Sequence, residues 1–149
     1  MRHYNFMLIL FALLVTSVTI MAAEKTYVQD KTDIEQTINS FVKSVDSQNA
    51  DALEKSMIEN GAIVTLNTIT NKVDNYSTNK FVDLVKNGQK GGWVRNVNVS
   101  SVDVDGNTAM AKVEITDARL SESGFFTLVK EGNGWKIASE VTTLELKNK

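Results

Sequence analysis

The apolar residues that follow position 31 first recur at the spacing of an amphipathic helix. They fall three, four or seven positions apart, which places them on one helical face. Thr32 and Glu35 stand in the relation of a capping box, which marks a helix start. We therefore expect a helix that begins near Thr32, after a flexible polar lead-in over residues 24–31, and ends near residues 47–49. Its buried face consists of Ile34, Ile38, Phe41, Val42 and Val45.

The apolar pattern then changes several times over short distances. Asn60-Gly61 and Asn87-Gly88 each carry a glycine suited to the left-handed residue that closes a helix. Between them, β-branched residues favour extended backbone. The predicted elements are, in order, a helix over residues 50–58, a strand over 62–70, a polar loop over 71–75 and a helix that follows Ser77 or Thr78.

From residue 93 onward the apolar pattern has period two, which indicates four long strands. Its phase slips once, at Ser100-Ser101, as a β-bulge requires, so we expect a bent sheet. Asp105-Gly106 and residues 131–134 have the chemistry of tight hairpin turns, and residues 117–124 are expected to form a longer polar connection. The predicted inward residues of the last three strands are Ala109, Ala111, Val113, Ile115, Phe126, Leu128, Trp135, Ile137, Ser139 and Val141.

The N-terminus has the pattern of a secretory signal peptide. Arg2 supplies a positive charge, residues 6–21 form an apolar run, and Ala22-Ala23 offers a cleavage site. The run is shorter than a membrane-spanning helix needs, although an uncleaved anchor is the alternative. We expect cleavage after residue 23, a periplasmic or secreted product, and no membrane contact after cleavage.

Composition excludes several kinds of chemistry. The chain has no cysteine, and its one histidine, His3, falls within the predicted signal. Sixteen basic side chains stand against 18 acidic ones, and the lysines form no cluster that would follow a nucleic-acid backbone. We therefore expect no disulfide, no metal, no cofactor and no nucleic-acid partner. The segment 103–107 resembles the start of a calcium loop, but it lacks the later oxygen ligands and fits a hairpin turn better.

Three stretches resemble the nuclear transport factor 2-like superfamily. They are the helical segment 33–57, the hairpin around Val102–Val113 and the hairpin around Phe126–Ile137, and the last two are similar to the bacterial SnoaL-like and lumazine-binding-like branches. The resemblance implies a cone-shaped α+β domain of cystatin-like fold over residues 32–149. Three N-terminal helices would pack on a strongly curved antiparallel sheet.

The resemblance leaves the activity open, because the superfamily includes both enzymes and binding domains. Histidine-dependent dehydratase or cyclase chemistry is excluded after signal cleavage. A ketosteroid-isomerase-like or SnoaL-like enzyme would use carboxylates and a tyrosine, which Tyr76 and Asp117 could supply. An epoxide-hydrolase arrangement would need two aspartates around Arg95, and its predicted strand face carries none.

Tyr76, Trp93 and Arg95 are the candidate ligand-binding residues, and no residue is assigned a catalytic role. Trp93 and Arg95 share a predicted strand face, and Tyr76 immediately precedes the third helix. An aromatic surface with one cation suits a small apolar or anionic ligand, and Arg95 would then serve the ligand rather than stability. The alternative is that Trp93 belongs to the core and that Arg95 is a paired or exposed charge.

The hypothesis from sequence is an exported, non-catalytic domain that binds a small ligand or a partner segment. The superfamily also implies a homodimer formed through the outer face of the sheet. Three residues predicted to point outward could contribute to that interface, namely Val94, Met110 and Phe125.

Overall fold

The computed structural model describes residues 26–147 and divides the chain into two compact units, residues 1–32 and 33–149. A helix occupies residues 26–46, so the part of the expected lead-in that the structure describes is helical. Thr32 does not cap a helix, because its hydroxyl donates to the carbonyl of Val28 one turn earlier. The helix ends where predicted, just before residues 47–49.

The predicted second and third helices are both present. In α2 (Ala50–Ser56) the side chain of Asn49 accepts from the N–H of Ala52, and in α3 (Thr78–Lys86) Ser77 caps in the same way. Gly88 adopts the left-handed conformation that ends α3, as predicted. Asn60-Gly61 does not end α2, because Met57 already begins a strand.

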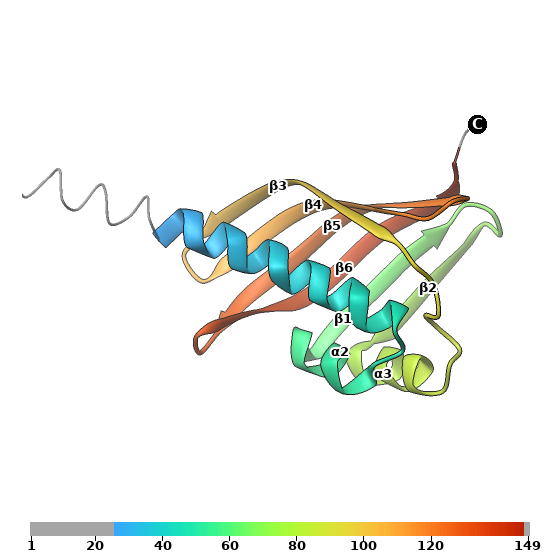
Figure 1. The fold of residues 1–149 in the computed structure, drawn as a ribbon, viewed down its shortest axis with the longest axis horizontal. Helices are drawn as coiled ribbons and strands as arrows, with labels where there is room; N and C mark the ends of the chain where they lie inside the picture. The colour runs from blue at the N-terminus through green and yellow to red at the C-terminus, as the bar shows by residue number, and fades with distance from the viewer. Residues whose placement is uncertain (1–25, 148–149) are drawn as a thin grey trace, which may run out of the picture. The chain divides into compact units, whose positions relative to one another are not determined.

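The sheet has six strands in the order β2-β1-β6-β5-β4-β3 (Figure 1). All neighbours are antiparallel except β1 and β6, which run parallel, so the sheet is mixed rather than wholly antiparallel as expected. The α+β class is confirmed. The strands are β1 (Met57–Asn67), β2 (Lys72–Ser77), β3 (Asn96–Asp105), β4 (Thr108–Thr116), β5 (Leu120–Glu131) and β6 (Gly134–Leu146).

Two segments that were predicted as polar loops are strands. Residues 71–75 fall largely within β2, an edge strand that pairs only with β1 and stays exposed for most of its length. Residues 120–124 begin β5 and contain polar side chains because this end of the sheet surrounds a cavity instead of a packed core. Neither segment shows alternating apolar residues in the sequence, because its side chains do not pack against an apolar layer.

Two bulges decide which side chains face inward. The predicted slip in β3 is confirmed. Val99 pairs with Val113 and Ser101 pairs with Lys112, so Ser100 has no paired residue in β4. A second irregularity, not predicted, lies in β6, where Ile137 pairs with Leu128 and Ser139 with Thr127. Ala138 is therefore unmatched, and the inward face shifts from odd to even positions.

This shift corrects the predicted inward face of the last strand. Trp135 and Ile137 are buried as expected, but Ser139 is only half-buried and Val141 is exposed. Glu140 and Thr142 point inward in their place.

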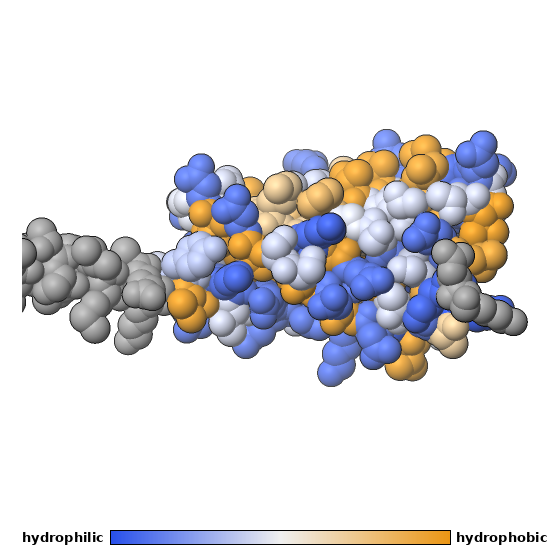
Figure 2. Space-filling model, turned by 90° about the horizontal axis from the view of Figure 1, so that it is seen from above, coloured by the Kyte–Doolittle hydropathy of each residue, from blue (hydrophilic) through white to orange (hydrophobic). Residues whose placement is uncertain are grey.

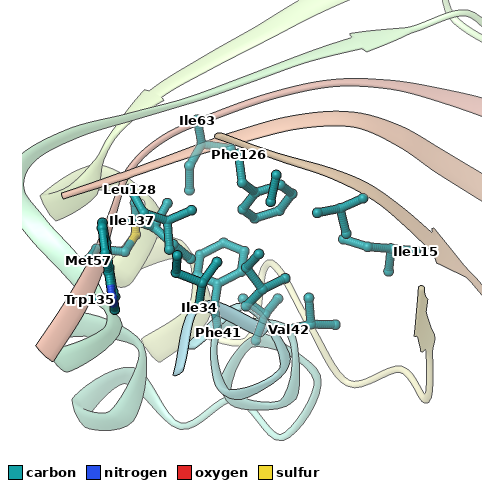
Figure 3. Packing of buried hydrophobic residues seen from close by; sticks show 14 of the residues in the cluster. Ile34, Phe41, Val42, Met57, Ile63, Ile115, Phe126, Leu128, Trp135 and Ile137 are labelled. Atoms are coloured by element: carbon teal, nitrogen blue, oxygen red, sulfur yellow. The ribbon is translucent and has the colours of Figure 1, made fainter. Parts of the chain in front are cut away.

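The core lies between the sheet and the apolar face of the helix segment 33–46. Figure 3 shows Ile34, Phe41 and Val42 directed toward the inner face of the sheet, where Phe126 is fully buried. The Phe41 ring meets Phe126 edge-on at 5.7 Å and stacks on Phe81 of α3 at 6.2 Å. At one end of this core, Trp135 lies beside Met57 and its carbonyl accepts from the Thr37 hydroxyl.

The predicted signal peptide lies outside the described residues. Within residues 26–147, no helix has both the length and the apolar character that crossing a membrane would require.

Candidate functional site

A cavity of about 130 Å³ lies where the strands extend beyond the packed core. Its deep surface is apolar and includes Phe41, Phe81, Ile63 and Ile115. The core side chains therefore do not fill this end of the fold. A cavity of about 150 Å³ is enough to admit benzene, so this one can take a small ring or several waters.

All three predicted ligand-binding residues line this cavity. Tyr76 reaches it from β2, whereas Trp93 and Arg95 come from the segment just before β3 rather than from the strand itself. Trp93 is 48% exposed, so it does not belong to the core. The structure thus brings the three together, and their role in binding stays a prediction.

Arg95 is held between two carboxylates. Its Nε donates to Asp46 Oδ1 at 2.7 Å, and its Nη1 lies 3.5 Å from Glu122 Oε2. The Arg95 side chain is only 13% exposed, and its guanidinium lies over the Trp93 ring, 5.4 Å from the centroid. No aspartate was expected on the strand face of Arg95, and its two acidic partners come from other elements, Asp46 from the helix and Glu122 from β5.

Glu122 is also fixed by two threonines. Its Oε1 accepts from the hydroxyl of Thr142 at 2.7 Å and from that of Thr65 at 3.3 Å. These bonds, together with Arg95, satisfy the Glu122 carboxylate as an ion. Asp46, Arg95 and Glu122 therefore form one connected network, of which Arg95 and Glu122 line the cavity.

Glu140 is the most unusual residue of the site. It lines the cavity and is 4% exposed. Burial raises the pKa of its carboxyl well above the usual range, and the neighbouring negative charge of Glu122 raises it further, against smaller opposing effects of Arg95 and Lys90. Such a carboxyl favours its neutral form and can donate a hydrogen bond.

Glu140 was not predicted as a site residue, because the odd-numbered inward face of the last strand was expected to continue to residue 141. One signal could have shown the slip. The apolar Leu144 stands at an even-numbered position, whereas Trp135 and Ile137 stand at odd-numbered ones. After the bulge the even-numbered residues Glu140, Thr142 and Leu144 are buried or partly buried. The same kind of phase change had revealed the bulge of β3.

Asp117 is held in a different state from Glu140. Its Oδ1 accepts from the backbone N–H groups of Arg119 and Leu120, both at 2.7 Å, and these bonds lower its pKa. Asp117 therefore stays ionised and closes the turn between β4 and β5. Although Tyr76 and Asp117 both line the cavity, Asp117 is committed to the backbone.

Other candidate chemistry is limited. Residues 103–107 form the hairpin between β3 and β4, with Gly106 in the left-handed conformation, as the sequence indicated. Across the described part of the chain, no three or more histidine, cysteine or acidic residues are grouped so that they could hold a metal ion.

Helices packed on a bent mixed sheet, with a cavity at one end, define an α+β domain of the nuclear transport factor 2-like class. Solved structures with this fold include a protein of unknown function from Silicibacter pomeroyi (TM-score 0.67, 18% identity, 81% of this chain and 98% of that one). A ketosteroid isomerase-like protein from Erwinia carotovora atroseptica is also similar (TM-score 0.59, 11% identity, 76% and 94%). These likenesses show the fold.

The chain belongs to the family described as "Putative lumazine-binding", whose model matches residues 29–141. A domain of cystatin-like fold from Nostoc punctiforme is a further structural relative (TM-score 0.63, 14% identity, 80% of this chain and 79% of that one). A comparison with curated proteins finds no match. The resemblance predicted from the sequence is therefore confirmed.

Proposed function

We propose that this protein is an exported, non-catalytic domain that binds a small ligand in the cavity beside Glu140. The observation that carries the proposal is the Glu140 carboxyl, an acidic group that is almost fully buried and lines the cavity. Removing a carboxyl from water is unfavourable. A protein that needed only a stable core would gain from an apolar residue at this position, so the carboxyl favours a ligand that can bond to it.

The surroundings of Glu140 support the same proposal. Phe41 and Phe81 offer apolar surface for the body of a ligand, and Trp93 and Tyr76 lie toward more exposed parts of the cavity. Apolar surface for the body of a ligand, together with polar groups that fix its orientation, is the usual composition of a small-molecule site. Arg95 is no longer available as a free cation, because Asp46 and Glu122 already balance its charge.

Lumazine, which the family's description names, is the first probe to test. Titration of the protein with lumazine should perturb the fluorescence of Trp93, and Trp93→Phe should remove that response. Native mass spectrometry of protein from its own host would detect a resident ligand and the oligomeric state together. The proposal would be refuted if nothing binds in the cavity. This means that lumazine, the host's own small molecules, benzylammonium, benzyl alcohol and benzoate all fail to bind.

An enzyme that uses acid–base chemistry in the same cavity is the second candidate. It is favoured by the raised pKa of Glu140, since a general acid or base works best when its pKa lies near the working pH. Carboxylates of this kind also occur in isomerases. Turnover of β,γ-unsaturated ketones or epoxides that disappears in Glu140→Gln would establish this alternative.

Export remains part of the proposal and rests on the signal-like segment 1–23. N-terminal sequencing of the protein from the periplasm or medium should find a start near Glu24. A membrane-bound product that retains Met1 would contradict it.

We also propose a homodimer through the outer face of the sheet. Val94, Met110 and Phe125 point outward as predicted, and Phe125 pairs across strands with the exposed Val141. The face displayed in Figure 2 carries apolar surface in several places between hydrophilic residues. Sedimentation should give a dimer that Phe125→Glu converts to a monomer, whereas a monomeric wild-type protein would refute the interface.

A further inference from the structure

We propose that the cavity takes a small organic cation, a protonated amine or amidine carried on an apolar or aromatic body. The inference rests on the proposed ligand binding and names the chemical class of the ligand. It is carried by the position of the buried Glu140 carboxyl in the cavity wall, beside the Asp46–Arg95–Glu122 network and near aromatic surfaces.

The cations of the site are already paired, whereas its carboxyl groups are in excess. Lys90 Nζ lies 3.6 Å from Asp74 Oδ2, which balances that charge. Arg95 faces both Asp46 and Glu122, so this cluster alone has more negative than positive charge.

Two more carboxyl groups line the same cavity. Asp117 is ionised, and Glu140 is almost fully buried in the cavity wall. An anionic ligand would meet this surplus of negative charge, and the two basic residues that line the cavity, Lys90 and Arg95, are already paired with carboxylates. A positively charged ligand instead gains from the surplus and offers donors to Glu140.

Aromatic faces provide the second part of the argument. The side chains of Lys90 and Arg95 already lie over the Tyr76 and Trp93 rings, 5.3 Å and 5.4 Å from the centroids. These rings are therefore placed where positive charge is stabilised by the π-electrons. Phe81, whose centroid is 6.2 Å from that of Tyr76, extends the aromatic surface inward to the apolar end of the cavity.

Binding of a cation should change the protonation of Glu140. Its neighbours across the sheet, Ile63 on β1 and Phe126 on β5, are apolar, and the charged groups that act on it are Glu122, Arg95 and Lys90. A ligand cation beside Glu140 favours the carboxylate, so complex formation should release up to about one proton per site. The proton goes to the buffer, and the ligand's charge is neutralised by the carboxylate.

Three probes of similar shape separate the possible ligand classes: benzylammonium, benzyl alcohol and benzoate. Isothermal titration of the protein near neutral pH should show that benzylammonium binds at least about tenfold more tightly than benzyl alcohol, because a hydrogen bond between charged groups is stronger than one between neutral groups. Benzoate should not bind measurably. The heat of benzylammonium binding should vary with the ionisation heat of the buffer, which reports the released proton.

Glu140→Gln is the decisive variant, since it keeps the shape and removes the acid. It should weaken benzylammonium about tenfold or more and abolish the proton release, while benzyl alcohol binds as before. Glu145→Gln, at an exposed position on the same strand, is the matched control and should change neither quantity. Should Glu140→Gln fail to fold, proton release by the wild-type protein still tests the inference.

The outcomes distinguish the inference of a cationic ligand from the proposal that the cavity binds a ligand at all. If benzoate or benzyl alcohol binds in the cavity as tightly as benzylammonium, the cation inference is wrong and ligand binding stands. If none of the three probes and neither lumazine nor a host molecule binds, both are wrong. Tight binding of benzylammonium that Glu140→Gln leaves unchanged would also overturn the inference.

Discussion

Arg95 and Asp46 are joined twice, because the Arg95 backbone N–H donates to Asp46 Oδ2 at 3.1 Å and Arg95 Nε donates to Oδ1 at 2.7 Å. These bonds tie the end of the helix to the segment that precedes β3. Arg95, expected from the sequence to serve mainly a ligand, therefore also holds the protein together.

Arg95→Ala should lower the free energy of unfolding by about 3 kcal/mol, because it leaves Asp46 and Glu122 as poorly solvated charges without their partner. Chemical denaturation would measure the loss. Lys90→Ala is the matched control, since the Lys90–Asp74 pair is much more exposed and should contribute less than about 1 kcal/mol. Equal effects of the two substitutions would show that the Arg95 network does not stabilise the fold.

The stability of the protein should depend on pH through Glu140. Its pKa is raised in the folded state, so the folded protein holds this proton more tightly than the unfolded chain does. The stabilisation is complete below the unfolded pKa of about 4.3 and is lost as the pH rises through the higher folded pKa. Urea denaturation across this interval should show the decline in wild type and a flatter curve in Glu140→Gln. A decline that persists in Glu140→Gln would assign it to another group.

Asp117 should have the opposite dependence. Its pKa is lowered by the backbone N–H groups of Arg119 and Leu120, so its stabilisation is present above the unfolded pKa near 3.9 and is lost as the pH falls through the folded value. Asp117→Ala should cost about 1 kcal/mol at neutral pH, because the two N–H groups lose a charged acceptor. At a pH below the folded pKa, the difference from wild type should shrink. A constant difference across the acidic range would contradict this role.

Gly124 lies where β5 approaches β6 closely. A Cβ at this position would be 2.1 Å from the carbonyl oxygen of Val141, which is far too short for any side chain. Gly124→Ala should therefore destabilise the protein by about 1–3 kcal/mol through displacement of the strand backbone. Gly134→Ala, which meets nothing within 4 Å, is the control and should be nearly neutral in thermal denaturation. A neutral Gly124→Ala would show that the strands can separate at no cost.

The two tryptophans should separate stability from binding. Trp135 is 4% exposed and packs in the core, so Trp135→Ala should cost about 3–5 kcal/mol. Trp93 is half-exposed at the cavity, so Trp93→Ala should leave the melting temperature nearly unchanged and weaken ligand binding. Paired melting curves and titrations of both variants would check this division, and a large loss of stability in Trp93→Ala would place Trp93 in the core.

Much of the scaffold was determined by local patterns in the sequence. The helical spacing from Ile34 to Val45 predicted the buried face that the structure shows, and the phase slip at Ser100-Ser101 predicted the bulge in β3. The turn at residues 131–134 and the buried Trp135 also followed from the chain. These features depend on neighbouring residues, so periodicity and turn chemistry suffice to identify them.

The site was decided by the tertiary structure. Asp46, Arg95 and Glu122 meet although the helix, the segment before β3 and β5 are far apart in sequence, and no local pattern encodes their contact. Glu140 faces the cavity because Ala138 is unmatched by β5, and one extra residue in a strand exchanges its two faces. The sequence by itself determined the buried helix face from Ile34 to Val45, the hairpin turns at residues 105–106 and 131–134, and most strands of this fold. Only the pairing of the strands decided which carboxyl is buried, because inward or outward orientation depends on register across the sheet.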